Sequence, residues 1–137
     1  MLVLDTGPIV ALLDADEADH ARCTALLDEV GEDLVVPAPV LVEVDYWARK
    51  RVGREAWSVF VEDLASGAYR LENLDERDVA RAAELEATYA DLPLGFVDAA
   101  VVVVCERLGE EKVATLDRQH FSVVRPRHCG ALTLLPV

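Results

Sequence analysis

The N-terminal stretch MLVLDTGP, residues 1–8, places three apolar residues, Leu2–Leu4, directly before Asp5. A similar stretch, VATLD, occupies residues 113–117 and leads to Asp117. Short, almost wholly apolar runs are typical of strands that are buried on both faces, as they are in parallel sheets. Each stretch is therefore predicted to form a buried parallel strand that leads to a carboxylate at its carboxyl end.

Outward from these two stretches, short apolar runs alternate with longer segments of helical periodicity. Three further runs are interpreted as strands, at residues 34–36, 69–71 and 132–135. Helices are predicted at residues 16–30, 39–52, 54–66 and 75–89, with Asp16 and Asp75 as N-terminal caps. Strands that alternate with helices indicate an α/β fold with a parallel sheet covered on both faces.

The segment FVDAAVVVVCERL, residues 96–108, is ambiguous. Its run of valines at residues 101–104 favours a strand when it is taken alone. The length of the whole segment and the glycine that follows it, Gly109, favour a buried helix. A helix is the preferred interpretation, and it places Asp98 in the first turn.

Composition indicates one domain over residues 1–137, because 53% of the 137 residues are apolar and can form a sizeable core. The cysteines, Cys23, Cys105 and Cys129, are far apart and lack a zinc-binding spacing, so free thiols in a reducing cytoplasm are expected. The N-terminus has no basic region of a signal peptide, and no run reaches the ~18 apolar residues that cross a bilayer. We therefore expect a cytoplasmic protein without a membrane partner.

Three acids occupy positions that are typical of a ligand site. Asp5 and Asp117 follow strands, and ligands of open α/β sheets bind outside the carboxyl ends of strands. Asp98 begins a helix, where the helix dipole favours an ionised carboxylate, although a simple N-terminal cap would explain it equally well. If the strands are neighbours, these carboxylates can share one pocket.

Glu43 is the most informative acid, because it interrupts an apolar helix face. In PVLVEVDYWARKR, residues 39–51, the side chains of Val40, Val44 and Trp47 lie beside it. Burial of a carboxylate there is unfavourable unless the group is paired or bound to a metal ion. The nearby Asp45 has an ordinary explanation, since Arg49 follows at i+4 and can form a surface ion pair with it.

A cluster of carboxylates suits magnesium, which prefers oxygen ligands and is usually bound by a few carboxylates together with substrate phosphates. Such ions can activate water and neutralise the leaving oxygen in phosphodiester cleavage, so no histidine base is required. The acids Asp5, Glu43, Asp98 and Asp117 are therefore predicted to bind Mg²⁺ for hydrolysis of a phosphodiester.

Four segments resemble the motif regions of PIN domains and, more narrowly, of the VapC-type toxins of bacterial toxin–antitoxin modules. They are LVLDTGPIVALLD at residues 2–14, VLVEVDYW at 40–47, GFVDAAVVVV at 95–104 and ATLDRQHF at 114–121. The resemblance implies a three-layer PIN-like fold with a central parallel five-stranded sheet flanked by helices. It also implies a Mg²⁺-dependent or Mn²⁺-dependent endoribonuclease that cleaves structured RNA, such as tRNA or rRNA.

By position, the resemblance makes Asp5, Glu43, Asp98 and Asp117 the catalytic, metal-binding acids. Thr6 and Thr115 match supporting hydroxyl residues, which either bind carboxylates or water or simply pack at strand ends. Some relatives carry a further acid near the third one, but residues 101–104 offer none. Either the fourth acid, Asp117, then matters more, or a second metal ion binds only with RNA. The resemblance further implies a homodimer and a cognate antitoxin that blocks the pocket, with an arginine among the acids.

The net charge of −13 opposes RNA binding, because an acidic chain repels nucleic acid. Basic residues cluster twice. The cluster after Asp117 is the preferred phosphate contact: Arg118, His120, Arg125 and Arg127. The earlier cluster is either a second contact or a solvated face with local ion pairs: Arg49, Lys50, Arg51 and Arg54.

Three other classes of protein place acids at strand ends. A phospho-receiver domain needs paired acids after its first strand and a lysine late in the sheet, but Thr6 and Gly7 follow Asp5 and Lys112 begins its strand. An aspartyl-phosphate phosphatase needs a second acid two residues after the first, where Gly7 stands. A PIN fold kept only for partner binding remains an alternative.

Overall fold

The central element of the fold is one parallel sheet. The computed structural model describes residues 1–137, and its sheet has the strand order β3-β2-β1-β4-β5 with every pair parallel. The strands are β1 (Leu2–Leu4), β2 (Leu34–Pro37), β3 (Arg70–Glu72), β4 (Lys112–Ala114) and β5 (Thr133–Leu135). The predicted parallel five-stranded sheet is confirmed, with each strand within two residues of its expected bounds.

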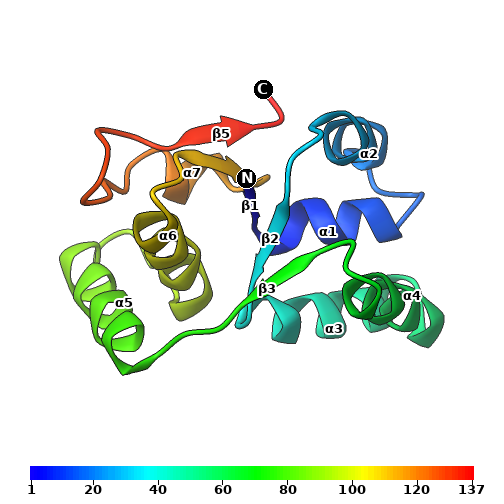
Figure 1. Cartoon of the computed structure of the whole chain (residues 1–137), viewed down its shortest axis with the longest axis horizontal. Helices are drawn as coiled ribbons and strands as arrows, with labels where there is room; N and C mark the ends of the chain where they lie inside the picture. The colour runs from blue at the N-terminus through cyan, green and yellow to red at the C-terminus, as the bar shows by residue number, and fades with distance from the viewer.

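Seven helices flank this sheet in two outer layers. They are α1 (Thr6–Leu13), α2 (His20–Glu29), α3 (Val40–Arg51), α4 (Arg54–Ala65), α5 (Glu76–Thr88), α6 (Phe96–Leu108) and α7 (Arg118–Phe121). Figure 1 shows α5 and α6 on one side of the sheet and α1 to α4 on the other. The predicted three-layer architecture is confirmed.

Two helices, α1 and α7, were not predicted. Helix α1 lacks a polar face, because most of its residues are buried, and so it carries no periodic signal. Helix α2 was predicted to begin at Asp16, which is wrong. The backbone N–H of Asp16 instead donates to the Asp14 carboxylate, and α2 begins after Asp19. Turns and a bend therefore occupy residues 15–19.

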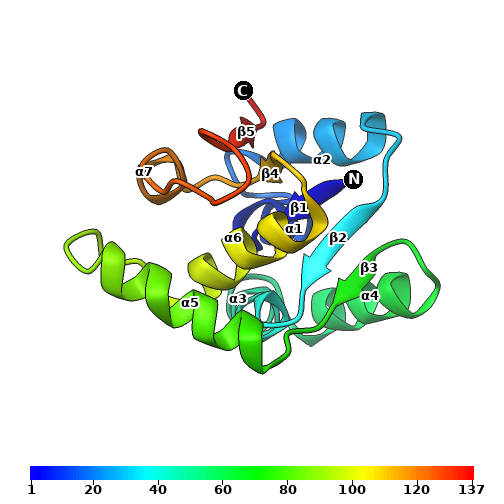
Figure 2. The same ribbon diagram turned by 60° about the vertical axis from the view of Figure 1, so that its left-hand side comes forward.

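Helix α6 resolves the ambiguity of the valine run in favour of a helix. Its residues 99–105 are buried, and it packs against β1 and β2. Figure 2 shows α5 lying along α6, on the side away from the sheet. Gly109 ends α6 with φ of 67°, a left-handed conformation that favours glycine. No helix has both the length and the hydrophobicity needed to cross a membrane.

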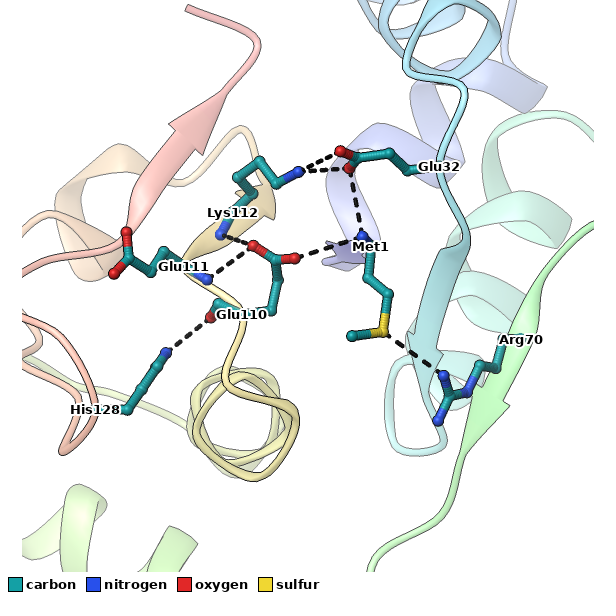
Figure 3. A network of polar contacts seen from close by, with 7 residues as sticks. All are labelled: Met1, Glu32, Arg70, Glu110, Glu111, Lys112 and His128. Carbon is teal, nitrogen blue, oxygen red and sulfur yellow. Dashed lines mark hydrogen bonds and ion pairs between the residues drawn. The ribbon is translucent and has the colours of Figure 1, made fainter.

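The amino ends of the central strands carry a network of paired charges. The amino group of Met1 lies 3.5 Å from carboxylate oxygens of both Glu32 and Glu110, and Lys112 Nζ donates to Glu32 Oε1 over 2.6 Å. Figure 3 shows these contacts, which link the segments around β1, β2 and β4. Glu32 and Glu110 thus each have a cation beside them.

At the opposite edge, the carboxyl ends of β1 and β4 lie side by side. Leu4 is in register with Ala114, and the backbone N–H of Asp5 donates to the Ala114 carbonyl over 2.9 Å. Asp5 therefore begins the loop after β1 beside Thr115, which follows β4. The parallel register thus brings together two acidic segments that are more than 100 residues apart in the chain.

Candidate metal centre

All four predicted acids line one cavity of about 650 Å³ at the carboxyl edge of the sheet. Its twelve lining residues come from the loops after β1 and β4 and from the helices around them: Asp5, Thr6, Gly7, Val10, Glu17, Asp19, Glu43, Trp47, Arg51, Asp98, Leu116 and Asp117. The predicted gathering of the acids is therefore present in the structure.

Asp5 is the most buried acid of the cavity, with 6% of its surface exposed. Its Oδ2 accepts a hydrogen bond of 2.8 Å from the Thr115 hydroxyl, and no salt bridge reaches it. Burial raises the pKa of Asp5 to about 6, and the neighbouring charges of Asp98 and Glu43 add to this rise. A carboxylate in this state gains strongly from a bound cation, because the cation would restore the charged form.

The two threonines beside the acids act as hydrogen-bond donors. The Thr6 hydroxyl, in the first turn of α1, donates to Glu43 Oε1 over 2.6 Å. The Thr115 hydroxyl donates to Asp5 and accepts the backbone N–H of Asp117 over 3.0 Å. Of the two alternatives left by the sequence, hydrogen bonding to carboxylates is the one the structure contains. Both hydroxyls fix the orientation of an acid.

Asp98 both caps α6 and faces the cavity. Its Oδ2 accepts the backbone N–H of Gly95 over 3.3 Å. Burial raises the pKa of Asp98, and the nearby Asp117 and Glu43 reinforce this rise against the opposing effect of the Gly95 N–H and His120. The helix dipole was expected to keep Asp98 readily ionised. The direction of its pKa shift is the reverse, because desolvation outweighs the helix terminus.

Asp117 and Asp98 form a tight group with His120. The Nδ1 atom of His120 lies 2.5 Å from Asp117 Oδ2 and 3.9 Å from Asp98 Oδ2. One ligand atom from each residue lies within 4.8 Å of the others, which is close enough for a shared metal ion. His120 reaches this place because Asp117 caps the short helix α7 and accepts its backbone N–H. The sequence did not reveal this contact, since α7 was not predicted.

None of the four favoured RNA-binding residues lines the cavity. Arg118 donates to the carbonyls of Leu134 and Pro136, and Arg125 to that of Ser122. Arg127 forms an ion pair with Glu84, and His120 contacts the acids.

The basic residue that does line the cavity is Arg51, from the cluster that was given less weight. In the same helix, the predicted surface ion pair between Asp45 and Arg49 is present. This pair accounts for Asp45 without a role in the cavity.

The donor set fits a hard divalent cation. The closely spaced ligand atoms come from Asp98, Asp117 and His120, while Asp5 and Glu43 line the same cavity outside this group. Carboxylate oxygens are the ligands that Mg²⁺ and Mn²⁺ prefer. The contrast with the other edge of the sheet supports this fit, since the acids there already have Met1 and Lys112 as counter-charges. The same Lys112 is remote from the acids of the cavity, which agrees with the rejection of a phospho-receiver domain.

Comparison with known proteins identifies the class. Residues 2–125 match the sequence profile of the PIN domain. Ribonuclease VapC26 of Mycobacterium tuberculosis is 37% identical over 135 residues, which are 98% of this chain and all of that protein. The chain therefore belongs to the PIN domain family. The resemblance to the VapC type that its four motifs showed is thereby confirmed.

Solved structures show the same fold at lower identity. The crystal structure of VapC20 of Mycobacterium tuberculosis, described as a toxin that cleaves the sarcin–ricin loop, has a TM-score of 0.81 at 21% identity. The alignment covers 86% of this chain and 91% of that one. FitAcB from Neisseria gonorrhoeae has a TM-score of 0.65 at 22% identity, covering 87% of this chain and 89% of that one.

Proposed function

We propose that the chain, as one PIN domain over residues 1–137, is a Mg²⁺-dependent endoribonuclease. It would act as the toxin of a type II toxin–antitoxin module and cleave structured RNA, such as tRNA or rRNA. One observation supports this chemistry above the others. Asp5 is buried, forms no salt bridge and shares the cavity with the three other acids. A bound cation would balance their negative charges. The ribonuclease relative supports RNA as the substrate.

The roles of the residues follow from their positions. Asp5, Glu43, Asp98 and Asp117 would bind Mg²⁺, or Mn²⁺ as a substitute, while Thr6 and Thr115 hold Glu43 and Asp5 in orientation. A cation held by these acids would supply the positive charge that activates water and stabilises the leaving oxygen of the phosphodiester. Without a bound cation, the acidic residues of the cavity would repel a phosphate group.

An RNA cleavage assay tests this function. The purified chain is incubated with total bacterial RNA in chelator and then after addition of Mg²⁺ or Mn²⁺. Discrete new 5′ ends that depend on the added metal ion are expected. Undamaged RNA under every metal condition, with the chain shown to be folded, would instead favour a PIN fold kept for partner binding.

Further proposals concern partners and location. The acidic cavity would attract an arginine of a cognate antitoxin, because a guanidinium binds carboxylates through paired hydrogen bonds. We also propose that the chain forms a homodimer and acts in the cytoplasm. Co-expression with the product of a small reading frame directly upstream should abolish RNA cleavage, and sedimentation should give twice the mass of the 15.0 kDa chain. Continued cleavage would contradict the proposed antitoxin, and a monomer would contradict the proposed homodimer.

A further inference from the structure

The cavity extends beyond the acids along one face of α3. Glu43, Trp47 and Arg51 are each four residues apart on this helix, and all three line the cavity. Residues spaced in this way follow one another along a helix face at steps of about 6 Å. A row of three side chains thus leads from a metal-binding acid to an aromatic ring and then to a guanidinium.

The far end of this row has the chemistry of a nucleotide site. The guanidinium carbon of Arg51 lies over the Trp47 ring, 5.1 Å from its centre, and Lys50 Nζ lies 5.4 Å from the same centre. The indole is therefore already a surface on which a planar cation packs. Arg51 is the only lysine or arginine that lines the cavity. Bases of single-stranded RNA stack on aromatic rings, and guanidinium groups bind phosphate through paired hydrogen bonds.

Besides the Trp47 ring, Arg51 is held by one exposed ion pair. Its Nη1 donates to Glu17 Oε2 over 3.0 Å, but 45% of the Arg51 side chain is exposed. Exposed ion pairs contribute little to stability, so a phosphate could replace Glu17 as the partner. Glu17 lines the same cavity and would hold Arg51 at its wall until then.

We propose that Trp47 and Arg51 form a subsite for an unpaired RNA nucleotide next to the cleaved phosphodiester. The base stacks on Trp47, and its phosphate binds Arg51. This inference rests on the proposed function, because the metal-binding acids would hold the neighbouring phosphate. It predicts that the cleaved position lies in a loop or another unpaired segment, since a paired base cannot stack on the ring.

The chain allows a direct optical test. Its two tryptophans are Trp47 and Trp57, and Trp57 lies on α4 against Phe60, outside the cavity. The variant Trp57→Phe leaves Trp47 as the only indole. Its fluorescence is measured during titration with a short unstructured oligoribonucleotide, with Ca²⁺ in place of Mg²⁺ to limit cleavage. Saturable quenching is expected, and an abasic oligonucleotide of the same length should quench much less.

Variants of the otherwise native chain separate the two contacts. Trp47→Ala should weaken binding of the oligonucleotide on the order of tenfold, and Trp47→Phe should recover most of the loss. Arg51→Ala should weaken binding and reduce its dependence on salt, because one phosphate contact is lost. Arg54→Ala is the matched control outside the cavity and should have no effect.

The inference fails if base and abasic oligonucleotides quench Trp47 equally, or if Arg51→Ala and Arg54→Ala behave alike. It also fails if an antitoxin peptide quenches Trp47 whereas the oligonucleotide does not. RNA cleavage that is unaffected by Trp47→Ala and Arg51→Ala would remove the subsite and leave the proposed function intact. A different outcome would support the subsite but contradict the nuclease function. In that case the oligonucleotide binds and quenches Trp47 in a base-dependent way, but no RNA is cleaved under any metal condition.

Discussion

The hydroxyl of Thr115 donates a hydrogen bond of 2.8 Å to Oδ2 of Asp5, across 110 residues of sequence. The Oγ1 atom of Thr115 also accepts the backbone N–H of Asp117. One side chain thus couples the carboxyl ends of β1 and β4, which carry the first and last acids of the candidate metal centre. This coupling makes the geometry of the acids depend on a residue that would not itself bind metal.

Thr115→Val tests this coupling. The substitution replaces the hydroxyl by a methyl group, so Asp5 loses its side-chain donor and the N–H of Asp117 loses its acceptor. Loss of such a buried partner costs about 1–3 kcal/mol of folding stability. Mg²⁺ affinity measured by calorimetry should fall as well, because Asp5 is no longer held in orientation. Thr133→Val, on the exposed side of β5, is the control. Equal Mg²⁺ affinity in the two variants would show that the hydroxyl does not organise the site.

Asp5→Asn should change the pH dependence of stability in metal-free buffer. The pKa of Asp5 rises from 3.8 to about 6 on folding, so between these pH values the folded state retains a proton that the unfolded state has lost. The contribution of Asp5 to stability therefore falls as pH rises through this window. Above pH 6, the variant should be more stable than the native chain by on the order of 3 kcal/mol. Below pH 4 the difference should vanish, and urea titrations at both pH values would detect it. A pH-independent difference would contradict the raised pKa.

Magnesium should stabilise the folded chain, because the acids form a site only in the folded state. The gain is about 2.7 kcal/mol when the free ion is at 100 times its dissociation constant. For a domain of this size the gain corresponds to a rise in Tm of roughly 9 °C. Asp98→Asn should melt at or above the native chain in chelator, since it removes repulsion, and should respond less to Mg²⁺. If the Tm of the native chain does not respond to Mg²⁺ or Mn²⁺, and Asp98→Asn has a lower Tm in chelator, then Asp98 acts only as a helix cap.

Expression of the chain alone in a bacterium should arrest growth, and Glu43→Gln should relieve the arrest. The amide can still accept the hydrogen bond from Thr6, so the fold is kept while a negative ligand is lost. Colony counts at matched protein levels measure the effect. Normal growth with the native chain would count against a toxin, and continued arrest with Glu43→Gln would remove Glu43 from the site.

The sequence predicted the sheet well, because its central strands, β1, β2 and β4, include short apolar runs that are buried between helices. It also located the acids, since Asp5 and Asp117 follow such runs and Glu43 interrupts an apolar helix face. It missed α1, which is buried all round, and α7, which has four residues and no periodicity. The missing α7 explains why His120 was assigned to phosphate rather than to the acids.

Arg51 was undervalued for a different reason. The sequence pattern of its cluster is typical of a solvated helix face. Only the packing of α1 against α3 shows that this face borders the acids. The opposite error concerned Arg125 and Arg127, which lie near Asp117 in sequence but pair with groups outside the cavity. Closeness to Asp117 in the sequence therefore did not place these residues at the site, because the segment that carries them turns away from the cavity.

Cleavage by a matched pair of variants tests the central claim most directly. Asp98→Asn and Asp45→Asn remove one negative charge each, but only Asp98 lines the cavity. Both variants and the native chain are incubated with the same RNA in Mg²⁺, after circular dichroism has shown equal folding. The account predicts cleavage by the native chain and by Asp45→Asn, and none by Asp98→Asn or in chelator. Full cleavage by Asp98→Asn, or cleavage that persists in chelator, would contradict a carboxylate-held metal ion as the source of activity.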